Sequence, residues 1–371
     1  MKILAIDTSC DETSVAVTEG TRVLSNIIWS QASLHAKWGG VVPSLAQREH
    51  EKRIDWVVEK ALKKAFSGLR STDYGLQKNI DAVAVTVGPG LAIALGVGIN
   101  KAKELAKKYK LPIILINHVE GHLLSAFAES RNSKLQFYKS QTTKKDVLKF
   151  KDMFPAIGVV ASGGTTQVIL IKKIGTYKII ANTMDDALGE ALDKGARTLG
   201  LGYPGGAILE RIAKEGKYDF SLFPIPMLGR EKILKFSYSG LKTALVRKLD
   251  EFKKTNSLNK ETVHNIACSY QETAFKHFIR ITQKAINKAS ETNHLKSIFV
   301  GGGVGANVLF RKKLRILAKE NNLKIYFPYS KRLYTDNAVM IGVTAYLKNY
   351  KLKIINYKFS NIDRKPNLKL S

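Results

Sequence analysis

The stretch KILAIDTS, from Lys2 to Ser9, decides the fold class, because an apolar run of strand length ends there in an acid and a polar turn. A hairpin follows, in which Thr13–Thr18 leads back along Arg22–Ile27. The same order recurs later, where strand Ala156–Ala161 meets a Ser-Gly-Gly turn and a second hairpin, Gln167–Lys172 with Lys178–Asn182. The repetition predicts two similar lobes, each with a sheet that opens on a hairpin.

Strands and helices alternate after each hairpin. In the first part we expect helices at His50–Phe66, Leu91–Lys108 and from His118, with strands at Ala82–Val87 and Pro112–Ile116. In the second part we expect strands at Ser297–Val300 and Lys324–Phe327, with helices at Gly305–Lys319 and Thr335–Leu347. Alternation favours largely parallel sheets covered by helices, and such sheets bind ligands beyond the carboxyl ends of their strands. The motifs that end these strands are therefore expected to meet in a cleft between the lobes.

A polar, Lys-rich stretch separates the two parts. It suggests an N-terminal lobe over 1–130, a basic connecting insertion over 131–152 and a C-terminal lobe over 153–371, with the last helix and tail packing back on the first lobe. The chain carries 60 Lys and Arg against 31 Asp and Glu, a formal charge of +29. Such an excess attracts a polyanion such as tRNA, although a generally Lys-rich proteome explains it equally well.

Composition also restricts the compartment. Two cysteines, Cys10 and Cys268, form no disulfide framework and no zinc motif. The N-terminus reads as a buried strand rather than a signal peptide. Ala82–Asn100 lacks charge, but the Gly-Pro-Gly at its centre favours a strand, a turn and a helix over a membrane span. We expect a cytoplasmic protein with no membrane segment.

Three turns are candidate phosphate sites. DTSCDETS (Asp7–Ser14) and SGGTT (Ser162–Thr166) occupy equivalent places in the two lobes, and GGGVGAN (Gly301–Asn307) joins a strand to a helix. Glycines and free backbone N–H groups at such turns suit a phosphate. Each is also compatible with an ordinary turn, and Asn307 with a helix cap. Their occurrence in both lobes favours a phosphate gripped from two sides, as in folds of the actin/sugar kinase/Hsp70 (ASKHA) class.

A metal site is suggested by NHVEGH, in which His118 and His122 share one face of a helix. Asp336, at the start of a late helix, offers a carboxylate, and two His with one Asp leave open positions for a ligand. An isolated pair of this spacing is also often incidental. A zinc protease is disfavoured because Val119 stands where HExxH needs its Glu. Asp186–Lys194, the Tyr203–Gly206 turn and Glu210 suit either ribose hydroxyls or a terminated helix, and FSYSGLKT (Phe236–Thr243) indicates no role by composition.

Taken in order from Ile3 to about Ala345, these motifs resemble the universal tRNA N6-threonylcarbamoyladenosine transferases. The resemblance rests on DTSCDETS, GGVVP, GPG, NHVEGH, SGG, GEALDK, YPGG, FSYSGLKT, GGGVGAN and TDNAVMI. It implies an α/β ASKHA fold of duplicated ribonuclease-H-like lobes with an interlobe cleft. It also implies transfer of a threonylcarbamoyl group from threonylcarbamoyl-AMP to N6 of adenosine 37 in tRNAs that read codons starting with A.

The resemblance also implies site residues, a metal and partners. One divalent metal, Fe²⁺ or else Zn²⁺, falls on His118, His122 and Asp336, and Asp11 and Glu12 match acids near the reacting carbonyl. Substrate contacts fall on Val160, Ala161, Ser162, Gly163, Gly164, Asp193, Gly206, Glu210 and Asn307. The anticodon arm of tRNA, a silent paralogue (TsaB-like) and a small P-loop ATPase (TsaE-like) are the expected partners.

Departures from the family pattern affect contacts rather than metal ligands. Thr165 replaces the usual His or Asn, Ser44 a frequent Glu, Gln47 a frequent Ser, and Gly305 the usual Ser or Ala. The stretch Lys134–Lys151 is longer and more basic than usual, so it either contacts tRNA or is simply solvated. A nucleotide-dependent ASKHA kinase or chaperone-like switch is the main alternative function, and a non-catalytic scaffold is the other.

Overall fold

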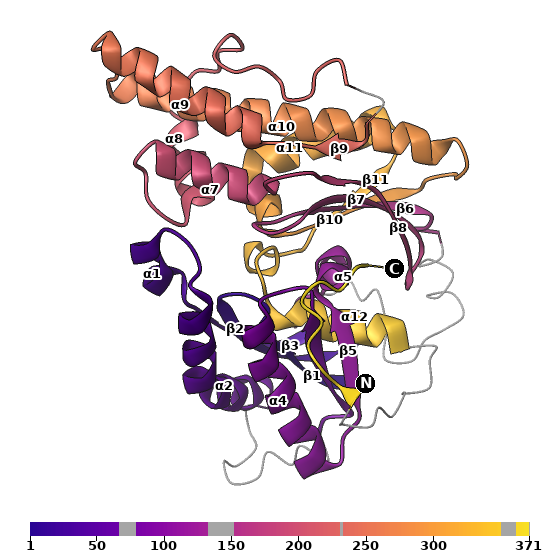
Figure 1. Cartoon of the computed structure of the whole chain (residues 1–371). Helices are drawn as coiled ribbons and strands as arrows, with labels where there is room; N and C mark the ends of the chain where they lie inside the picture. The colour runs from indigo at the N-terminus through magenta and orange to yellow at the C-terminus, as the bar shows by residue number, and fades with distance from the viewer. Residues whose placement is uncertain (67–78, 133–151, 231–232, 350–360, 371) are drawn as a thin grey trace. The chain divides into compact units, whose positions relative to one another are not determined.

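The computed structural model describes residues 1–66, 79–132, 152–230, 233–349 and 361–370 (Figure 1). The predicted insertion at 131–152 lies almost wholly outside the described residues. The chain divides into two compact units. The first unit comprises Met1–Phe154, Lys173–Tyr177 and Tyr326–Ser371, and the second comprises Pro155–Lys172 and Lys178–Ile325.

The first unit contains a five-stranded sheet of order β3-β2-β1-β4-β5. Its strands are β1 (Lys2–Asp7), β2 (Glu12–Glu19), β3 (Arg22–Ser30), β4 (Ala82–Gly88) and β5 (Ile113–Asn117). β1 is antiparallel to β2 and parallel to β4, which is parallel to β5. The carboxyl ends of β1, β4 and β5 therefore share one edge, which brings Asp7, Gly88 and Asn117 to the same side of the sheet.

Helices cover both faces of this sheet. Because successive side chains of β1 point to opposite faces, its apolar residues pack against helices on both sides. Leu4 and Ile6 join the core formed with α2 (Pro43–Ala65) and α4 (Ala92–Tyr109), whereas Ala5 faces Gly342 of α12 (Ala338–Asn349). Further helical segments among the described residues of the unit include α1 (Ala32–His35), α5 (His118–Leu124) and the short turns η1 (Ala36–Trp38), η2 (Ser125–Phe127) and η4 (Lys331–Leu333). α2 begins earlier than expected because Pro43, with its fixed φ, occupies the first helical turn.

The second unit repeats the plan in a six-stranded sheet of order β11-β10-β6-β7-β8-β9. The strands are β6 (Ala156–Ala161), β7 (Thr166–Lys173), β8 (Thr176–Thr183), β9 (Lys235–Phe236), β10 (Ser297–Gly301) and β11 (Lys324–Tyr326). The helices are α7 (Leu188–Thr198), α8 (Gly205–Ala213), α9 (Ser239–Lys254), α10 (Lys260–Ser290) and α11 (Val308–Glu320), with a short turn η3 (Gly303–Ala306). β6 is antiparallel to β7 and parallel to β10, so β6, β7 and β10 match β1, β2 and β4. The predicted repetition of the α/β lobe is confirmed.

Two late helices begin after the predicted residue, and for the same reason. Asn307 Oδ1 accepts a hydrogen bond from Phe310 N (3.1 Å) and Asn337 Oδ1 accepts one from Met340 N (3.2 Å). Each asparagine therefore caps its helix and stands outside it. As a result, Asp336 lies on the loop just before α12.

The Gly-Pro-Gly turn joins β4 to α4, as its composition suggested. A Cβ on Gly88 would lie 1.8 Å from the carbonyl oxygen of Lys365, and one on Gly90 would lie 2.5 Å from that of Ser9. Only glycine allows the C-terminal segment and the β1 turn to approach so closely. Among the helices of the described residues, none has the length and hydrophobicity needed to cross a membrane.

Candidate metal centre and nucleotide-binding turns

The two histidines are presented by the start of α5. The Oδ1 atom of Asn117, the last residue of β5, accepts hydrogen bonds from Val119 N (2.9 Å) and Glu120 N (3.2 Å). This cap begins α5 at His118, so that His118 and His122 project from one face, one helical turn apart. Both side chains are buried.

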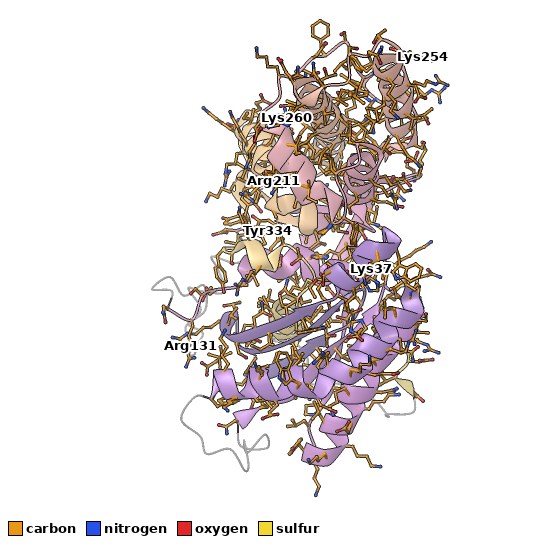
Figure 2. The ribbon with its side chains drawn as sticks, turned by 90° about the vertical axis from the view of Figure 1, so that its left-hand side faces the viewer. Lys37, Arg131, Arg211, Lys254, Lys260 and Tyr334 are labelled. Atoms are coloured by element: carbon orange, nitrogen blue, oxygen red, sulfur yellow. The ribbon has the colours of Figure 1, made fainter. Side chains whose placement is uncertain are left out.

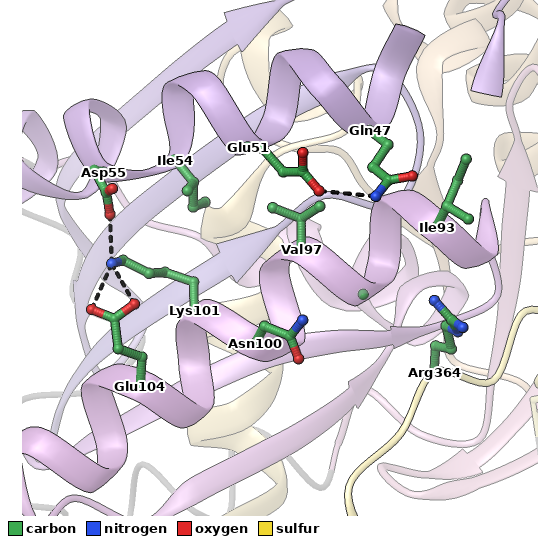
Figure 3. A pocket seen from close by; sticks show the side chains of 11 residues that line it. Gln47, Glu51, Ile54, Asp55, Ile93, Val97, Asn100, Lys101, Glu104 and Arg364 are labelled. Atoms are coloured by element: carbon green, nitrogen blue, oxygen red, sulfur yellow. Dashed lines mark hydrogen bonds and ion pairs between the residues drawn. The ribbon is translucent and has the colours of Figure 1, made fainter. Parts of the chain in front are cut away.

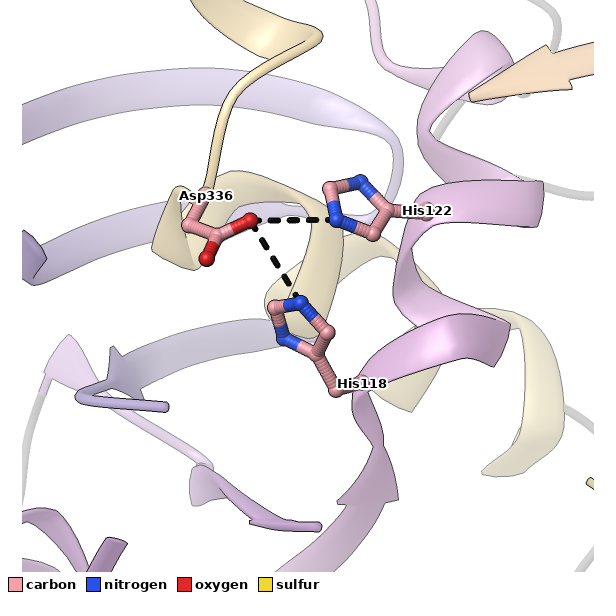
Figure 4. Close-up of side chains that lie close together, drawn as sticks. All are labelled: His118, His122 and Asp336. Carbon is pink, nitrogen blue, oxygen red and sulfur yellow. Dashed lines mark hydrogen bonds and ion pairs between the residues drawn. The ribbon is translucent and has the colours of Figure 1, made fainter. Parts of the chain in front are cut away.

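Asp336 completes the cluster in the first unit (Figure 4). Its Oδ1 lies 3.4 Å from Nε2 of His118 and 3.1 Å from Nε2 of His122. The two helices can approach because residue 121 is glycine: a Cβ there would lie 3.0 Å from Ile341 Cδ1 of α12. The glycine of NHVEGH therefore serves the packing that brings Asp336 to the imidazoles.

These three side chains fit a divalent cation. Donors bound 2.0–2.2 Å from one ion stand about 3–3.5 Å apart, and the measured separations from Asp336 Oδ1 lie in this range. The donor atoms all lie within 4.8 Å of one another. Nδ1 of each histidine is buried and has no hydrogen-bond partner among the described residues, and Asp7 Oδ1 approaches His118 Nδ1 only to 3.7 Å. Nitrogen and carboxylate ligands suit Fe²⁺ and Zn²⁺ alike, so geometry does not choose between them.

The charges within the cluster reinforce one another. Burial alone would lower the pKa of His118, but the Asp336 carboxylate close to the ring, with a further contribution from the nearby Asp7 carboxylate, raises it to about 10. Burial alone would raise the pKa of Asp336, but the two imidazoles hold it well below its usual range. The carboxylate is therefore ionised and available as a ligand.

The orientation of α5 depends on Glu120, a residue that sequence reasoning missed. Its buried carboxylate accepts hydrogen bonds from Tyr177 Oη and Lys348 Nζ, both at 2.8 Å. All three residues belong to the first unit. An acid between two histidine ligands, on the opposite side of the helix, was the only sequence signal for it. Glu120 therefore orients the helix that carries the imidazoles.

Asp11 and Glu12 lie at the start of β2, in the same unit. Burial and the neighbouring Asp11 carboxylate raise the pKa of Glu12 well above its usual range, and burial together with Asp11 also raises that of the Cys10 thiol. The strand start is held by His50, which sequence reasoning also missed. Its Nε2 lies 3.0 Å from the Cys10 carbonyl and its Nδ1 lies 2.8 Å from Thr13 Oγ1. Burial lowers the pKa of His50, so the ring is neutral and donates to the Cys10 carbonyl.

In the second unit, the Ser162 turn follows β6. Ser162 N donates to Thr165 O (2.8 Å), and Ser162 Oγ accepts from Thr165 N (3.0 Å). Gly163 and Gly164 at its tip are exposed, and a Cβ on either would meet no atom within 4 Å. By contrast, a Cβ on Gly189 would lie 2.5 Å from Ser162 O. The backbone of the turn is therefore open to a ligand on one side and packed on the other.

The other predicted substrate residues of the second unit brace its helices. Asp193 Oδ1 accepts from Gly206 N (2.6 Å), and Glu210 Oε1 accepts from Val308 N (2.9 Å). Asn307 Nδ2 donates to Gln271 Oε1 (2.8 Å). Val160 and Ala161 form the end of β6, where Val160 pairs with Gly301. These contacts connect α7 with α8, α8 with α11, and α11 with α10.

The FSYSGLKT segment has a partner that its composition did not reveal. The carboxylate of Asp185 accepts hydrogen bonds from Ser237 Oγ (2.5 Å), Tyr238 N (2.8 Å) and Ser239 Oγ (2.9 Å). Burial opposes ionisation, but these bonds outweigh it and lower the pKa of Asp185. The segment is thereby anchored to the loop that precedes α7.

A hollow in the first unit lies between α2, α4 and Arg364 (Figure 3). Lys101 Nζ bridges Asp55 Oδ1 (2.5 Å) and Glu104 Oε2 (2.8 Å), and Gln47 donates to Glu51 (2.9 Å). Its charged groups thus largely satisfy one another. None of the residues expected to bind metal or substrate lines it.

The two α/β units share one strand order. The first carries a His-His-Asp cluster, and the second carries glycine-rich turns at the ends of its strands. Together these features define a protein of the ASKHA class. Solved structures of HypF share the fold. Full-length HypF in the phosphate- and nucleotide-bound form aligns with a TM-score of 0.53 and 14% identity over 95% of this chain and 46% of HypF. HypF from T. kodakarensis aligns with the same TM-score over 94% of this chain and 48% of HypF.

Sequence comparison gives the family. The model of the family TsaD, tRNA N6-adenosine threonylcarbamoyltransferase, matches residues 22–137 and 141–343. The enzyme of that name from Endomicrobium trichonymphae is 41% identical over 369 residues, covering 99% of this chain and 97% of the relative. That from Persephonella marina is 40% identical over 355 residues, covering 95% and 91%. The chain belongs to the tRNA N6-adenosine threonylcarbamoyltransferase family and is a transferase that acts on tRNA.

Proposed function

We propose that this chain transfers the threonylcarbamoyl group of threonylcarbamoyl-AMP to N6 of adenosine 37 in tRNAs that read codons starting with A. The observation that carries the proposal is the convergence of His118, His122 and Asp336 in a chain that matches the transferase family along nearly its whole length. For catalysis, the residues must bind the nucleotide, make the donor carbonyl more electrophilic, and accept the proton that the amine loses.

The reaction balances without an added reagent. The N6 amine attacks the carbamoyl carbon, a C–N bond forms, and the C–O bond to the phosphate breaks. AMP leaves with the electron pair, and the amine loses one proton. An exocyclic amine is a weak nucleophile, so the main tasks are positioning and stabilisation of the developing charge.

His118, His122 and Asp336 would hold the divalent metal, which we take to be Fe²⁺, with Zn²⁺ as the alternative. A metal at this position supplies Lewis acidity toward phosphate and carbonyl oxygens. Asp11 or Glu12 would accept the amine proton. The raised pKa of Glu12 suits it to this task, because a carboxylate that is hard to ionise is a stronger base once ionised.

The turns of the second unit would bind the AMP portion. The open backbone at Gly163 and Gly164 suits the phosphate, and Asp193, Gly206, Glu210 and Asn307 would surround the nucleoside. The basic surface would hold the anticodon arm by its phosphates. We place the enzyme in the cytoplasm, with a silent TsaB-like paralogue and a TsaE-like ATPase as partners.

Mass spectrometry of tRNA nucleosides tests the proposal. Unmodified tRNA is incubated with the protein, the proposed TsaB-like and TsaE-like partners, threonine, bicarbonate, ATP and the synthase that makes the donor. We expect threonylcarbamoyladenosine with the wild type and its loss with Asp336→Ala. ATP turnover by the purified chain alone, or its phosphorylation of a small molecule, with no modified nucleoside although the donor is present, would instead support an ASKHA kinase or switch.

A further inference from the structure

One tryptophan of the first unit differs from the others in its surroundings. Trp29 and Trp56 meet edge to face, with ring centroids 6.0 Å apart. Each is also covered by a cation, Arg53 at 4.4 Å and Lys60 at 4.3 Å. Trp38 is 69% exposed, and among the described residues it has no ring or cation partner. A large aromatic face is thus left open to solvent, which is costly unless something covers it.

Trp38 is held outward by a closed turn rather than by a loose loop. The ring of His35 in this turn is fully buried, with Nε2 3.1 Å from Gln31 Oε1 and Nδ1 accepting from Val42 N at 3.3 Å. Gln31 Nε2 also donates to Ala46 O at the start of α2 (3.3 Å). Both ends of the segment Gln31–Val42, here called the Trp38 turn, are therefore tied to the body of the unit.

The Trp38 turn starts next to Asp11 and Glu12, the proposed acceptors of the amine proton. Gln31 N donates to Asp11 O (3.0 Å), and Ser30 pairs with Glu12 across β2 and β3. From Gln31 to Trp38 the chain makes one α-helical and one 3₁₀ turn, a span of about 12 Å from the rise per residue. An RNA whose acceptor adenosine lies at Asp11 and Glu12 can therefore reach the Trp38 ring with a base a few nucleotides away.

Charge indicates what kind of occupant fits. From Gln31 to Arg48 the sequence contains two cations, Lys37 and Arg48, and no acid. Lys37, which precedes Trp38 in the sequence, is exposed at the surface of the first unit (Figure 2), and within the described part of the chain it makes no ion pair. An open aromatic face and an unneutralised cation in the same turn suit unpaired RNA, whose bases stack on aromatic rings and whose phosphates need countercharge.

We propose that Trp38 is a stacking platform for an unpaired base of the anticodon loop other than the acceptor adenosine, with Lys37 contacting an adjacent phosphate. The proposal rests on the proposed function, because it requires tRNA as the bound substrate. It assigns Trp38 to tRNA binding: the ring holds the loop without touching the reacting atoms.

Kinetics with purified tRNA provides the first test. Trp38→Ala should raise KM for tRNA about tenfold or more, the range expected for loss of one stacked base. KM for the donor, the bound metal and kcat at saturating tRNA should remain within about twofold. Trp38→Phe should restore most of the tRNA affinity, since a smaller ring still stacks. The matched control is Leu34→Ala, another exposed apolar side chain of the same turn, which should leave KM for tRNA unchanged.

Fluorescence provides a test that does not depend on turnover. An anticodon stem-loop RNA should quench the tryptophan emission of the wild type, and Trp38→Phe, which keeps Trp29 and Trp56, should lose most of that quenching. Lys37→Ala should weaken binding of the stem-loop and reduce its salt dependence.

A wild-type KM and Kd for tRNA in Trp38→Ala would overturn the proposal. So would unchanged tRNA binding accompanied by weaker binding of a partner protein, which would make Trp38 a protein contact. Failure of the wild type to modify tRNA would refute the proposed function instead. The two failures are therefore distinguishable.

Discussion

The two units share one strand order but present different chemical groups at the ends of their strands. In the first unit, β1 ends in the fully buried Asp7 and β5 leads into His118. In the second unit, β6 is followed by a turn with the exposed Gly163 and Gly164, and β10 leads into a glycine turn. One edge thus offers ionisable donors and the other offers backbone N–H groups.

The contrast extends to buried imidazoles. Asp336 raises the pKa of His118 in the first unit, whereas burial and the Arg280 guanidinium lower the pKa of His277 in the second to about 4. The fold fixes where side chains converge, and the residues at that place decide whether a cation or an anion binds. The predictions below are ordered from the largest expected effect to the smallest.

Removal of the metal carboxylate should have the largest effect. Asp336→Ala should weaken binding of the divalent metal by more than about 100-fold, because even residues behind the ligands change affinity 10- to 100-fold. Nucleotide binding by the second unit should persist. Equilibrium dialysis with metal analysis measures the effect, and Asp363→Ala, which removes an exposed acid, is the control. Equal metal affinity in the two variants would remove Asp336 from the site.

Glycine substitutions separate strain from ligand contact in the second unit. Gly302 has φ +88°, and a Cβ there would lie 2.4 Å from the Ala161 carbonyl oxygen. Gly302→Ala should cost about 2–4 kcal/mol of unfolding free energy, combining left-handed strain with a backbone clash. Gly163→Ala, which meets no atom within 4 Å, should change stability by less than about 1 kcal/mol. Urea unfolding compares the pair, and equal losses would contradict the packing described.

The buried His277 should make the second unit sensitive to acid. Its Nε2 accepts from Ser237 N (3.2 Å), so the ring must be neutral there. Since its pKa falls from 6.5 in the unfolded chain to about 4 in the fold, the stabilisation is complete above pH 6.5 and is lost as pH falls toward 4. We expect a loss of about 2 kcal/mol between pH 7 and 5. His277→Gln should flatten this slope in urea unfolding at the two pH values, and an unchanged slope would assign it to other groups.

The smallest effect should come from the residue that orients α5. Glu120→Gln keeps the shape but removes the charge that pairs with Lys348, and should weaken metal binding up to about tenfold. Tyr177→Phe removes only one hydrogen bond to the same carboxylate and should weaken it less. Metal titration of both variants ranks them. If Tyr177→Phe had the greater effect, the charge of Glu120 would not be what fixes the helix.

Much of the fold was predictable because hydrophobic period and turn residues are local signals. The buried strand before Asp7, the repeated hairpin and the shared face of His118 and His122 all follow from spacing within a few residues. Helix starts were less predictable, because Asn307 and Asn337 cap helices that the pattern alone would begin earlier.

Contacts between distant segments could not be predicted by the same means. Asp336 lies 214 residues from His122, and before the fold was known only the ligand chemistry of the three side chains and the resemblance to a family linked them. Asp185 anchors a segment more than 50 residues away, and Lys365 packs on Gly88 from the C-terminal end. These pairings depend on tertiary packing, which leaves no periodic trace in the sequence.

Anomalous diffraction from crystals of the metal-loaded full chain tests the central claim most directly. Data collected at the absorption edge of the bound metal should show one strong peak within about 2.3 Å of His118 Nε2, His122 Nε2 and a carboxylate oxygen of Asp336. A peak at any other group of ligands, in crystals of protein that modifies tRNA, would contradict the assignment of the metal centre to the first unit.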